Sequence, residues 1–297
     1  MNGDSRAAQG AQYGRPLIIE DISNRVFVHP LSSLVVRLAL ALRLSANTVS
    51  VLGLCAGLLS AWFYYHQSRP GYVVAGFALM VLWHILDGAD GRIARATGTA
   101  SAFGRIIDGI CDHLVFGAVY IAFILYALGQ GASPWIWALG VVSALSHALQ
   151  AAGYEERRQI FQRRMRGLSR KEVSENLLHV GEKKSVLATI YDRFQTLTSP
   201  KPSKLDVNIE ACRQQGMDAE KISSLVARTS PIVRAWGLLN ANNRTIMLAV
   251  CAGLGHPLWY FIYESVILNI VFAGLLVWER RFEHKLAQQS LAEAAAL

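Results

Sequence analysis

Apolar residues in this chain fall into long continuous stretches separated by short polar breaks. A helix needs roughly 20 apolar residues to cross a ~30 Å hydrocarbon layer, and stretches of that length begin near Asn47, Tyr72, Gly104, Trp135 and Pro257. A shorter sixth stretch runs from Thr245 to Gly255. The pattern predicts an all-α, polytopic membrane protein with about six transmembrane helices.

Two further segments flank or interrupt these stretches. Residues 30–45 are apolar but short and are interrupted by Arg37, which favours an N-terminal helix that lies in the membrane interface. Residues 155–243 are polar and contain a predicted helix at Asp218–Arg228, and Ser169 and Glu172 have capping-box spacing. We interpret this insert as a solvated regulatory or packing appendage. The predicted organisation is 1–47, a cytoplasmic segment with the interfacial helix; 48–154, four transmembrane helices; 155–243, the insert; 244–280, two transmembrane helices; and 281–297, a cytoplasmic tail.

Charge is distributed very unevenly about these stretches. The net charge of +8 raises the question of a nucleic-acid partner. However, of 29 Lys and Arg residues only Arg69 falls in a loop on the side opposite the N-terminus, and sixteen lie in the insert. The positive-inside rule accounts for this asymmetry, so we expect no nucleic-acid partner. It predicts a multi-pass protein of the cell inner (cytoplasmic) membrane with both ends in the cytoplasm.

The second and third apolar stretches contain four aspartates, although ionised carboxylates are costly inside a bilayer. Asp87 and Asp90 are three residues apart, and Gly104, Asp108 and Asp112 are each four apart, so each set shares one helix face. A short connection makes the two helices antiparallel neighbours. We therefore expect all four carboxylates to converge at the cytoplasmic end of the pair.

Four converging carboxylates would repel one another unless a cation were present. Mg²⁺ and Mn²⁺ are hard ions that take oxygen ligands, so the pattern predicts a divalent metal site. Gly91 and Gly104 leave room for a ligand, and Arg95 supplies a planar fork for phosphate. A single aspartate here would more often be a helix cap or a packing contact, but chance does not readily place the whole set in this spacing.

The stretch from Asp87 to Asp112 resembles the signature of the CDP-alcohol phosphatidyltransferase family. That signature is Asp-x-x-Asp-Gly-x-x-Ala-Arg, eight residues, then Gly-x-x-x-Asp-x-x-x-Asp, and every fixed position is matched. The resemblance implies two Mg²⁺ or Mn²⁺ ions bound by the four aspartates, with Asp112 also the proton acceptor. It implies that the CDP moiety is bound by Gly91, Ala94, Arg95, Ser101 and Gly104. A Pro-Asn-x-x-Thr stretch of many members corresponds here to residues 46–50, which adds Asn47 to that set.

The resemblance further implies a phospholipid-synthesising transferase. Its substrates would be CDP-diacylglycerol and a small polar alcohol, with CMP released by in-line attack and the site facing the cytoplasm. An alternative donor is a CDP-linked headgroup such as CDP-choline, transferred to a lipid alcohol. Two other classes are a cation transporter that uses the aspartate cluster and an inactive scaffold that binds lipid.

Several polar residues at membrane depth allow two interpretations. His84 is either near the metal site or packed between helices. His147, Glu264 and Asn269 either line the acceptor pocket or form interhelical hydrogen bonds. Gly53 and Gly57 predict a helix-packing face that also allows a homodimer. A phosphorylated acceptor would give a role to the basic residues at the cytoplasmic helix ends, Arg92, Arg105, Arg157 and Arg158.

Overall fold

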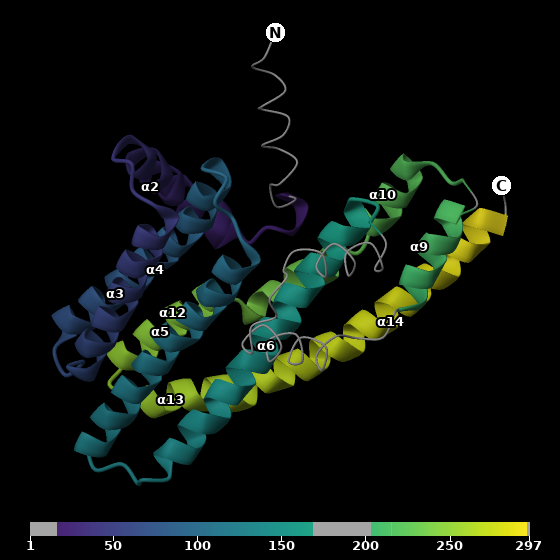
Figure 1. The fold of residues 1–297 in the computed structure, drawn as a ribbon. Helices are drawn as coiled ribbons and strands as arrows, with labels where there is room; N and C mark the ends of the chain where they lie inside the picture. The colour runs from purple at the N-terminus through teal and green to yellow at the C-terminus, as the bar shows by residue number, and fades with distance from the viewer. Residues whose placement is uncertain (1–16, 169–202, 215, 296–297) are drawn as a thin grey trace.

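The computed structural model describes residues 17–168, 203–214 and 216–295, and for residues 17, 102–108 and 290–295 it describes the backbone alone. These residues form helices, turns and bends without a strand, which confirms the all-α prediction. Figure 1 shows the arrangement. The helices are η1 Leu17–Ile19, η2 Asn24–Val28, α2 His29–Ala41, α3 Ala46–Tyr65, α4 Pro70–Ala96, α5 Ala102–Gly129, α6 Ile136–Met165, α9 Lys204–Gln214, α10 Ala219–Ala227, α11 Ser230–Trp236, η3 Gly237–Leu239, α12 Ala241–Gly253, α13 Pro257–Ile262, η4 Tyr263–Ile267 and α14 Leu268–Ala295.

Five spans among the described residues are long and apolar enough to cross a membrane: α3, α4, α5, α6 and the continuous run of α13, η4 and α14. Each begins within two residues of its predicted start. The sixth predicted span is α12, which has 13 residues and at 1.5 Å per residue covers only about 20 Å. It begins at an Asn240 cap, whose side chain accepts from the Asn243 backbone N–H, and it ends before Gly255, where φ is +73°.

Helix α3 packs against both α4 and α5. A Cβ added at Gly53 would lie 3.3 Å from Cβ of Leu86 on α4, and one at Gly57 would lie 2.4 Å from Cγ2 of Val115 on α5. Glycine is therefore needed for the close approach of α3 to α5. The helix-packing interpretation of this small-residue face is confirmed.

The N-terminal helices pack on the part of α4 that carries the motif. Ser32 Oγ of α2 donates to the Ile85 carbonyl over 2.9 Å, and Arg92 Nη1 donates to the His29 carbonyl over 3.3 Å. The predicted N-terminal helix is thus present as α2, and its position in the membrane interface stays a prediction.

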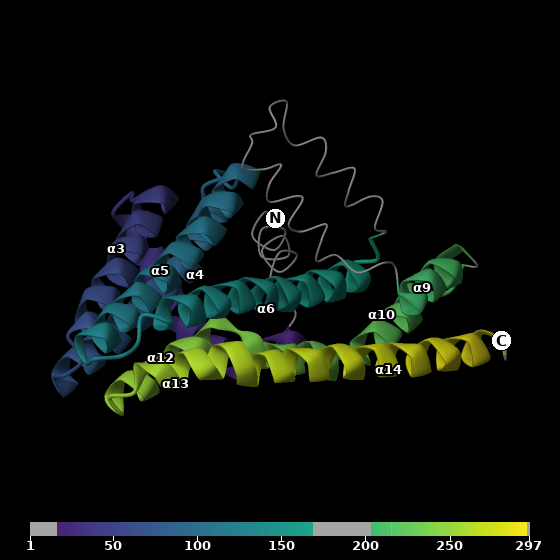
Figure 2. The same cartoon turned by 90° about the horizontal axis from the view of Figure 1, so that it is seen from below.

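Toward their C-terminal ends, α6 and α14 build a further apolar core with α9 and α10. Figure 2 shows α10 near the end of α6 and α9 beside the end of α14. Phe161 of α6, Leu205 of α9, Val226 of α10 and Leu286 of α14 are buried together there. The helix predicted at Asp218–Arg228 is confirmed as α10, with Asp218 accepting from the Glu220 backbone N–H. The Ser169 and Glu172 capping box lies outside the described residues.

Candidate active site

The first half of the motif lies on an unbroken stretch of α4. Asp90 is 7% exposed and Asp87 is half-buried, one helical turn apart. Among the described side chains, a Cβ added at Gly91 would meet Arg95 Nη1, at 3.5 Å. A guanidinium thus lies beside a position without a side chain, which suits the approach of a phosphate group.

Asp90 is held by a residue that the sequence analysis did not select. Ser50 Oγ of α3 donates a short hydrogen bond to Asp90 Oδ2. Ser50 occupies the last position of the Asn-x-x-Ser stretch, where the family pattern has threonine, and this position was the signal that could have found it. Asn47, one turn earlier on α3, is exposed.

The second half of the motif lies in the first turns of α5. The helix is continuous from Ala102, so Gly104, Asp108 and Asp112 share one face by their spacing. The Asp108 side chain and the surroundings of Gly104 lie outside the described residues. Asp112 is half-buried, and the exposed Ser101 lies in the connection just before α5.

Among the residues whose side chains are described, no three His, Cys, Asp or Glu are close enough to hold one metal ion. The Asp108 side chain lies outside the described residues, so the convergence of the four carboxylates stays a prediction. Deeper in the bundle, α4 and α5 touch through the rings of Trp83 and Phe116, whose centroids are 5.6 Å apart. The donor chemistry of the motif, all carboxylate oxygen with a supporting hydroxyl, nevertheless suits Mg²⁺ or Mn²⁺.

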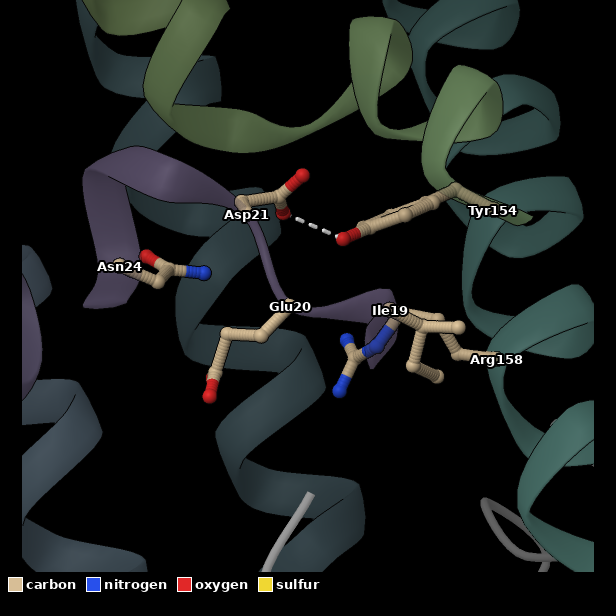
Figure 3. A pocket seen from close by; sticks show the side chains of 6 residues that line it. All are labelled: Ile19, Glu20, Asp21, Asn24, Tyr154 and Arg158. Carbon is tan, nitrogen blue, oxygen red and sulfur yellow. Dashed lines mark hydrogen bonds between the residues drawn. The ribbon is translucent and has the colours of Figure 1, made fainter. Parts of the chain in front are cut away.

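Two hollows lie away from the motif. In Figure 3, Tyr154 and Arg158 reach from α6 toward the N-terminal segment with Glu20 and Asp21, and Tyr154 Oη donates to Asp21 Oδ2 over 2.5 Å. This hollow holds about 10 Å³, room for about one water molecule. A larger one of about 270 Å³ lies at the opposite end, between the α5–α6 and α12–α13 connections.

The polar residues at membrane depth form a buried network. Arg244 and Glu264 are both 0% exposed, and Arg244 Nε lies 3.2 and 3.1 Å from the two carboxylate oxygens. Arg244 Nη2 also donates to Gln150 Oε1 over 2.6 Å, and Asn269 Nδ2 donates to Ser146 Oγ over 2.9 Å. Glu264 and Asn269 therefore form interhelical hydrogen bonds. Sequence analysis missed Arg244, which stands at the predicted boundary between the insert and the fifth span.

Two more of the ambiguous residues have described partners. His84 Nε2 lies 2.8 Å from Thr245 Oγ1 of α12, so His84 is packed between helices. Arg157 pairs with Glu279 at 3.1 Å, and its guanidinium lies 4.3 Å from the centroid of the Trp236 ring. Arg157 is thus engaged within the protein.

Comparison with known proteins identifies the segment that contains the motif. Residues 43–168 match the model of the CDP-alcohol phosphatidyltransferase family. This segment is similar to that family, and the match covers less than half of the chain. It includes α3 to α6, with Ser50, the four aspartates, Gly91 and Arg95.

Similar proteins are lipid-synthesising enzymes by name. A CDP-diacylglycerol–serine O-phosphatidyltransferase of Mycobacterium leprae is 39% identical over 102 residues, 34% of this chain and 32% of that protein. A phosphatidylinositol phosphate synthase of Mycobacteroides abscessus is 28% identical over 109 residues, 36% and 46%. An archaetidylinositol phosphate synthase of Pyrococcus horikoshii is 32% identical over 88 residues, 30% and 45%. Each match covers less than half of the relative's length, and no solved structure matches the chain significantly.

Proposed function

We propose that this protein transfers the phosphatidyl group of CDP-diacylglycerol to a small polar alcohol and releases CMP. The observation that carries the proposal is the family motif in membrane helices α4 and α5, with Asp90 buried and held by Ser50. A buried carboxylate fixed by a hydroxyl is suited to binding a ligand rather than to capping a helix.

Divalent metal ions are the expected cofactor, because the family generally depends on them. Two Mg²⁺ or Mn²⁺ ions would be held by Asp87, Asp90, Asp108 and Asp112. When bound, they would neutralise the charge of the pyrophosphate and of the departing CMP. Ser50 would orient Asp90 toward them, as outer-shell hydrogen bonds orient metal ligands.

The protein's own groups have separate roles in the proposed reaction. Arg95, beside Gly91, would bind the pyrophosphate, and Ala94, Ser101, Gly104 and Asn47 would complete the CDP site. Asp112 would take the proton of the incoming hydroxyl. The alcohol oxygen bonds to the phosphorus that carries diacylglycerol, and the bond from that phosphorus to the bridging oxygen breaks as CMP leaves.

The names of the relatives favour CDP-diacylglycerol as donor over a CDP-linked headgroup. One name gives CDP-diacylglycerol and serine as substrates, and another gives phosphatidylinositol phosphate as product. An amino acid and a phosphorylated alcohol are therefore both candidate acceptors. We propose membrane lipid as the environment, the inner (cytoplasmic) membrane as the location and a cytoplasmic opening of the site. A homodimer is compatible with the proposal but not required by it.

The test is CMP release by the purified full chain with Mn²⁺ or Mg²⁺. CDP-diacylglycerol would be supplied with serine, inositol, inositol 1-phosphate or glycerol 3-phosphate, each in a separate reaction, and CDP-choline with diacylglycerol would test the alternative donor. We expect Asp112→Asn to lower turnover by at least about a hundredfold, because a positioned general base contributes that much. Asp218→Asn, at the α10 cap, is the matched control and should keep activity.

Two results would overturn the proposal. One is full CMP release by Asp112→Asn. The other is cation flux through liposomes containing the protein, in the absence of nucleotide and without CMP release from any donor, which would indicate a transporter.

A further inference from the structure

The helix face that carries Asp112 continues into the membrane as a column of rings. Asp112, Phe116 and Tyr120 are four residues apart on α5 and so share one face. The Phe116 ring meets His147 of α6 edge-on, with centroids 4.5 Å apart. His147 is also stacked with His113, at 6.3 Å. One helical turn after the proposed proton acceptor, α5 therefore packs against α6 through the rings of Phe116 and His147.

Below this contact, a directed line of hydrogen bonds ties α5 to two other spans. Tyr260 Oη donates to Glu264 Oε2 over 3.0 Å, so the Tyr260 oxygen is left to accept from Tyr120 Oη, 3.1 Å away. Tyr120 Oη then accepts from His147 Nδ1, also at 3.1 Å. The line thus runs from His147 through Tyr120 and Tyr260 to Glu264, whose charge is matched by Arg244.

Glu264, where this line of hydrogen bonds ends, lies in an uncommon type of helical turn. Glu264 lies in η4, a π-helical turn at Tyr263–Ile267 between α13 and α14. Such turns inside α-helices are rare and are frequent at functional sites. Every donor and acceptor in the line is buried, where an unmade hydrogen bond is costly. Apolar packing tolerates small sliding of a helix along its axis. Hydrogen bonds have a narrow range of lengths, so these bonds restrict how far α5 can slide relative to α6 and α13.

We propose that Tyr120 is a positioning residue, which holds α5 at the height that presents Asp112 to the metal ions. The inference rests on the proposed function, because it concerns the same carboxylate site. Tyr120 acts through α5, two helical turns from Asp112, and touches no reacting atom. Loss of its hydroxyl should loosen the metal site and leave the binding of the CDP-lipid through Arg95 intact.

The test compares two tyrosines of the same apolar core. Tyr120→Phe removes the hydroxyl that bridges His147 and Tyr260. Tyr64→Phe is the matched control, since Tyr64 is 0% exposed and its hydroxyl has no hydrogen-bond partner among the described residues. Mn²⁺ affinity of the full chain in detergent would be measured by electron paramagnetic resonance, together with kcat and KM for CDP-diacylglycerol.

We expect Tyr120→Phe to raise the Kd for Mn²⁺ roughly tenfold, the lower end of the effect of losing a supporting contact at a metal site. Turnover should fall with it, and KM for the CDP-lipid should stay within about twofold. Tyr64→Phe should match wild type in all three values. Tyr260→Phe breaks the same line one bond further along, and it takes the place of Tyr120→Phe if that variant does not fold.

The outcomes separate this inference from the proposed function. Wild-type Mn²⁺ affinity in a folded Tyr120→Phe or Tyr260→Phe variant overturns the positioning role, and so does a wild-type protein that binds no Mn²⁺. Equal losses in Tyr120→Phe and Tyr64→Phe also overturn it, because a general packing defect would then explain both. If wild type binds Mn²⁺ but releases no CMP, the transferase proposal fails, and the affinities still decide whether Tyr120 positions the site.

Discussion

At the scale of single residues, Ser50 is the structure's main addition to the site. Its short hydrogen bond fixes the orientation of a buried carboxylate that the motif assigns to the metal. The sequence already showed that this position differs from the threonine of the family pattern. Because serine and threonine carry the same hydroxyl, the contact with Asp90 explains how the position can vary without loss of its role.

Replacement of Ser50 by alanine should weaken the metal site. We expect Ser50→Ala to raise the Mn²⁺ concentration for half-maximal CMP release roughly tenfold, because outer-shell partners of metal ligands commonly contribute 10- to 100-fold. Ser50→Thr restores the hydroxyl and should stay within about twofold of wild type. A Ser50→Ala enzyme with an unchanged metal requirement would show that the contact with Asp90 is incidental.

At the scale of helices, the starts of the spans could be predicted because length, apolarity and helix breakers all act locally. Pro70 and Pro257 stand in the first turns of α4 and α13, and Gly131 and Gly255 have positive φ in the connections. The short α12 was harder to predict, because the sequence of the apolar stretch at Thr245 does not show whether the helix spans the membrane. Arg244 was missed for the same reason: its partners Glu264 and Gln150 come from other spans, 20 and 94 residues away.

Loss of one partner of the Arg244–Glu264 pair should be far more damaging than loss of both. Glu264→Ala leaves a fully buried guanidinium uncompensated, which costs about 3–5 kcal/mol. Arg244→Met/Glu264→Leu removes both charges at similar volume and should recover most of that loss, since apolar replacement of a buried pair is often neutral or better. Thermal unfolding of the purified protein in detergent measures both.

The control for this comparison is Arg244→Met alone, which leaves the Glu264 carboxylate unpaired and should resemble Glu264→Ala. The double variant could instead lose as much stability as the sum of the losses in the two single variants. Arg244 and Glu264 would then each stabilise the fold through contacts other than their mutual charge neutralisation. Our account of the pair as mutually compensating charges would then be wrong.

At the scale of the whole molecule, α6 and the continuous run of α13, η4 and α14 connect the apolar core of the bundle with the core that includes α9 and α10 (Figure 2). The sequence predicted the membrane core and the motif within it. It did not predict that α6 continues to Met165 and carries Phe161 into the core with α9 and α10, because the residues after 155 are polar and were assigned to the insert. The convergence of the aspartates also stays a prediction, since it depends on the Asp108 side chain and on ions that the sequence cannot place.

The attachment of α9 to the end of α6 should depend on pH through Asp206 of α9. Arg164 Nε donates to Asp206 Oδ1 over 3.0 Å, and Arg163 Nη2 donates to the same oxygen over 2.8 Å. Burial alone would raise the pKa of Asp206, but the charges and hydrogen bonds of Arg164 and Arg163 outweigh it and hold that pKa below its usual 3.8. A carboxyl whose pKa is lowered on folding stabilises the fold above its unfolded pKa and ceases to do so as pH falls through the folded value. The attachment of α9 should therefore hold at neutral pH and weaken below about pH 4.

Hydrogen exchange of the Lys204–Gln214 amides, corrected for the intrinsic effect of pH, measures this attachment. In wild type we expect protection to fall as pH decreases from about 6 to about 3, across the usual carboxyl range. In Asp206→Asn, protection should be lower at pH 6 and nearly flat over the same range, because the titrating partner of Arg164 is gone. Asp218→Asn, at the exposed cap of α10, should keep the wild-type profile. A steep decline that persists in Asp206→Asn would assign the pH dependence to other carboxylates, with Glu283 next, since it pairs with Arg164 at 2.7 Å.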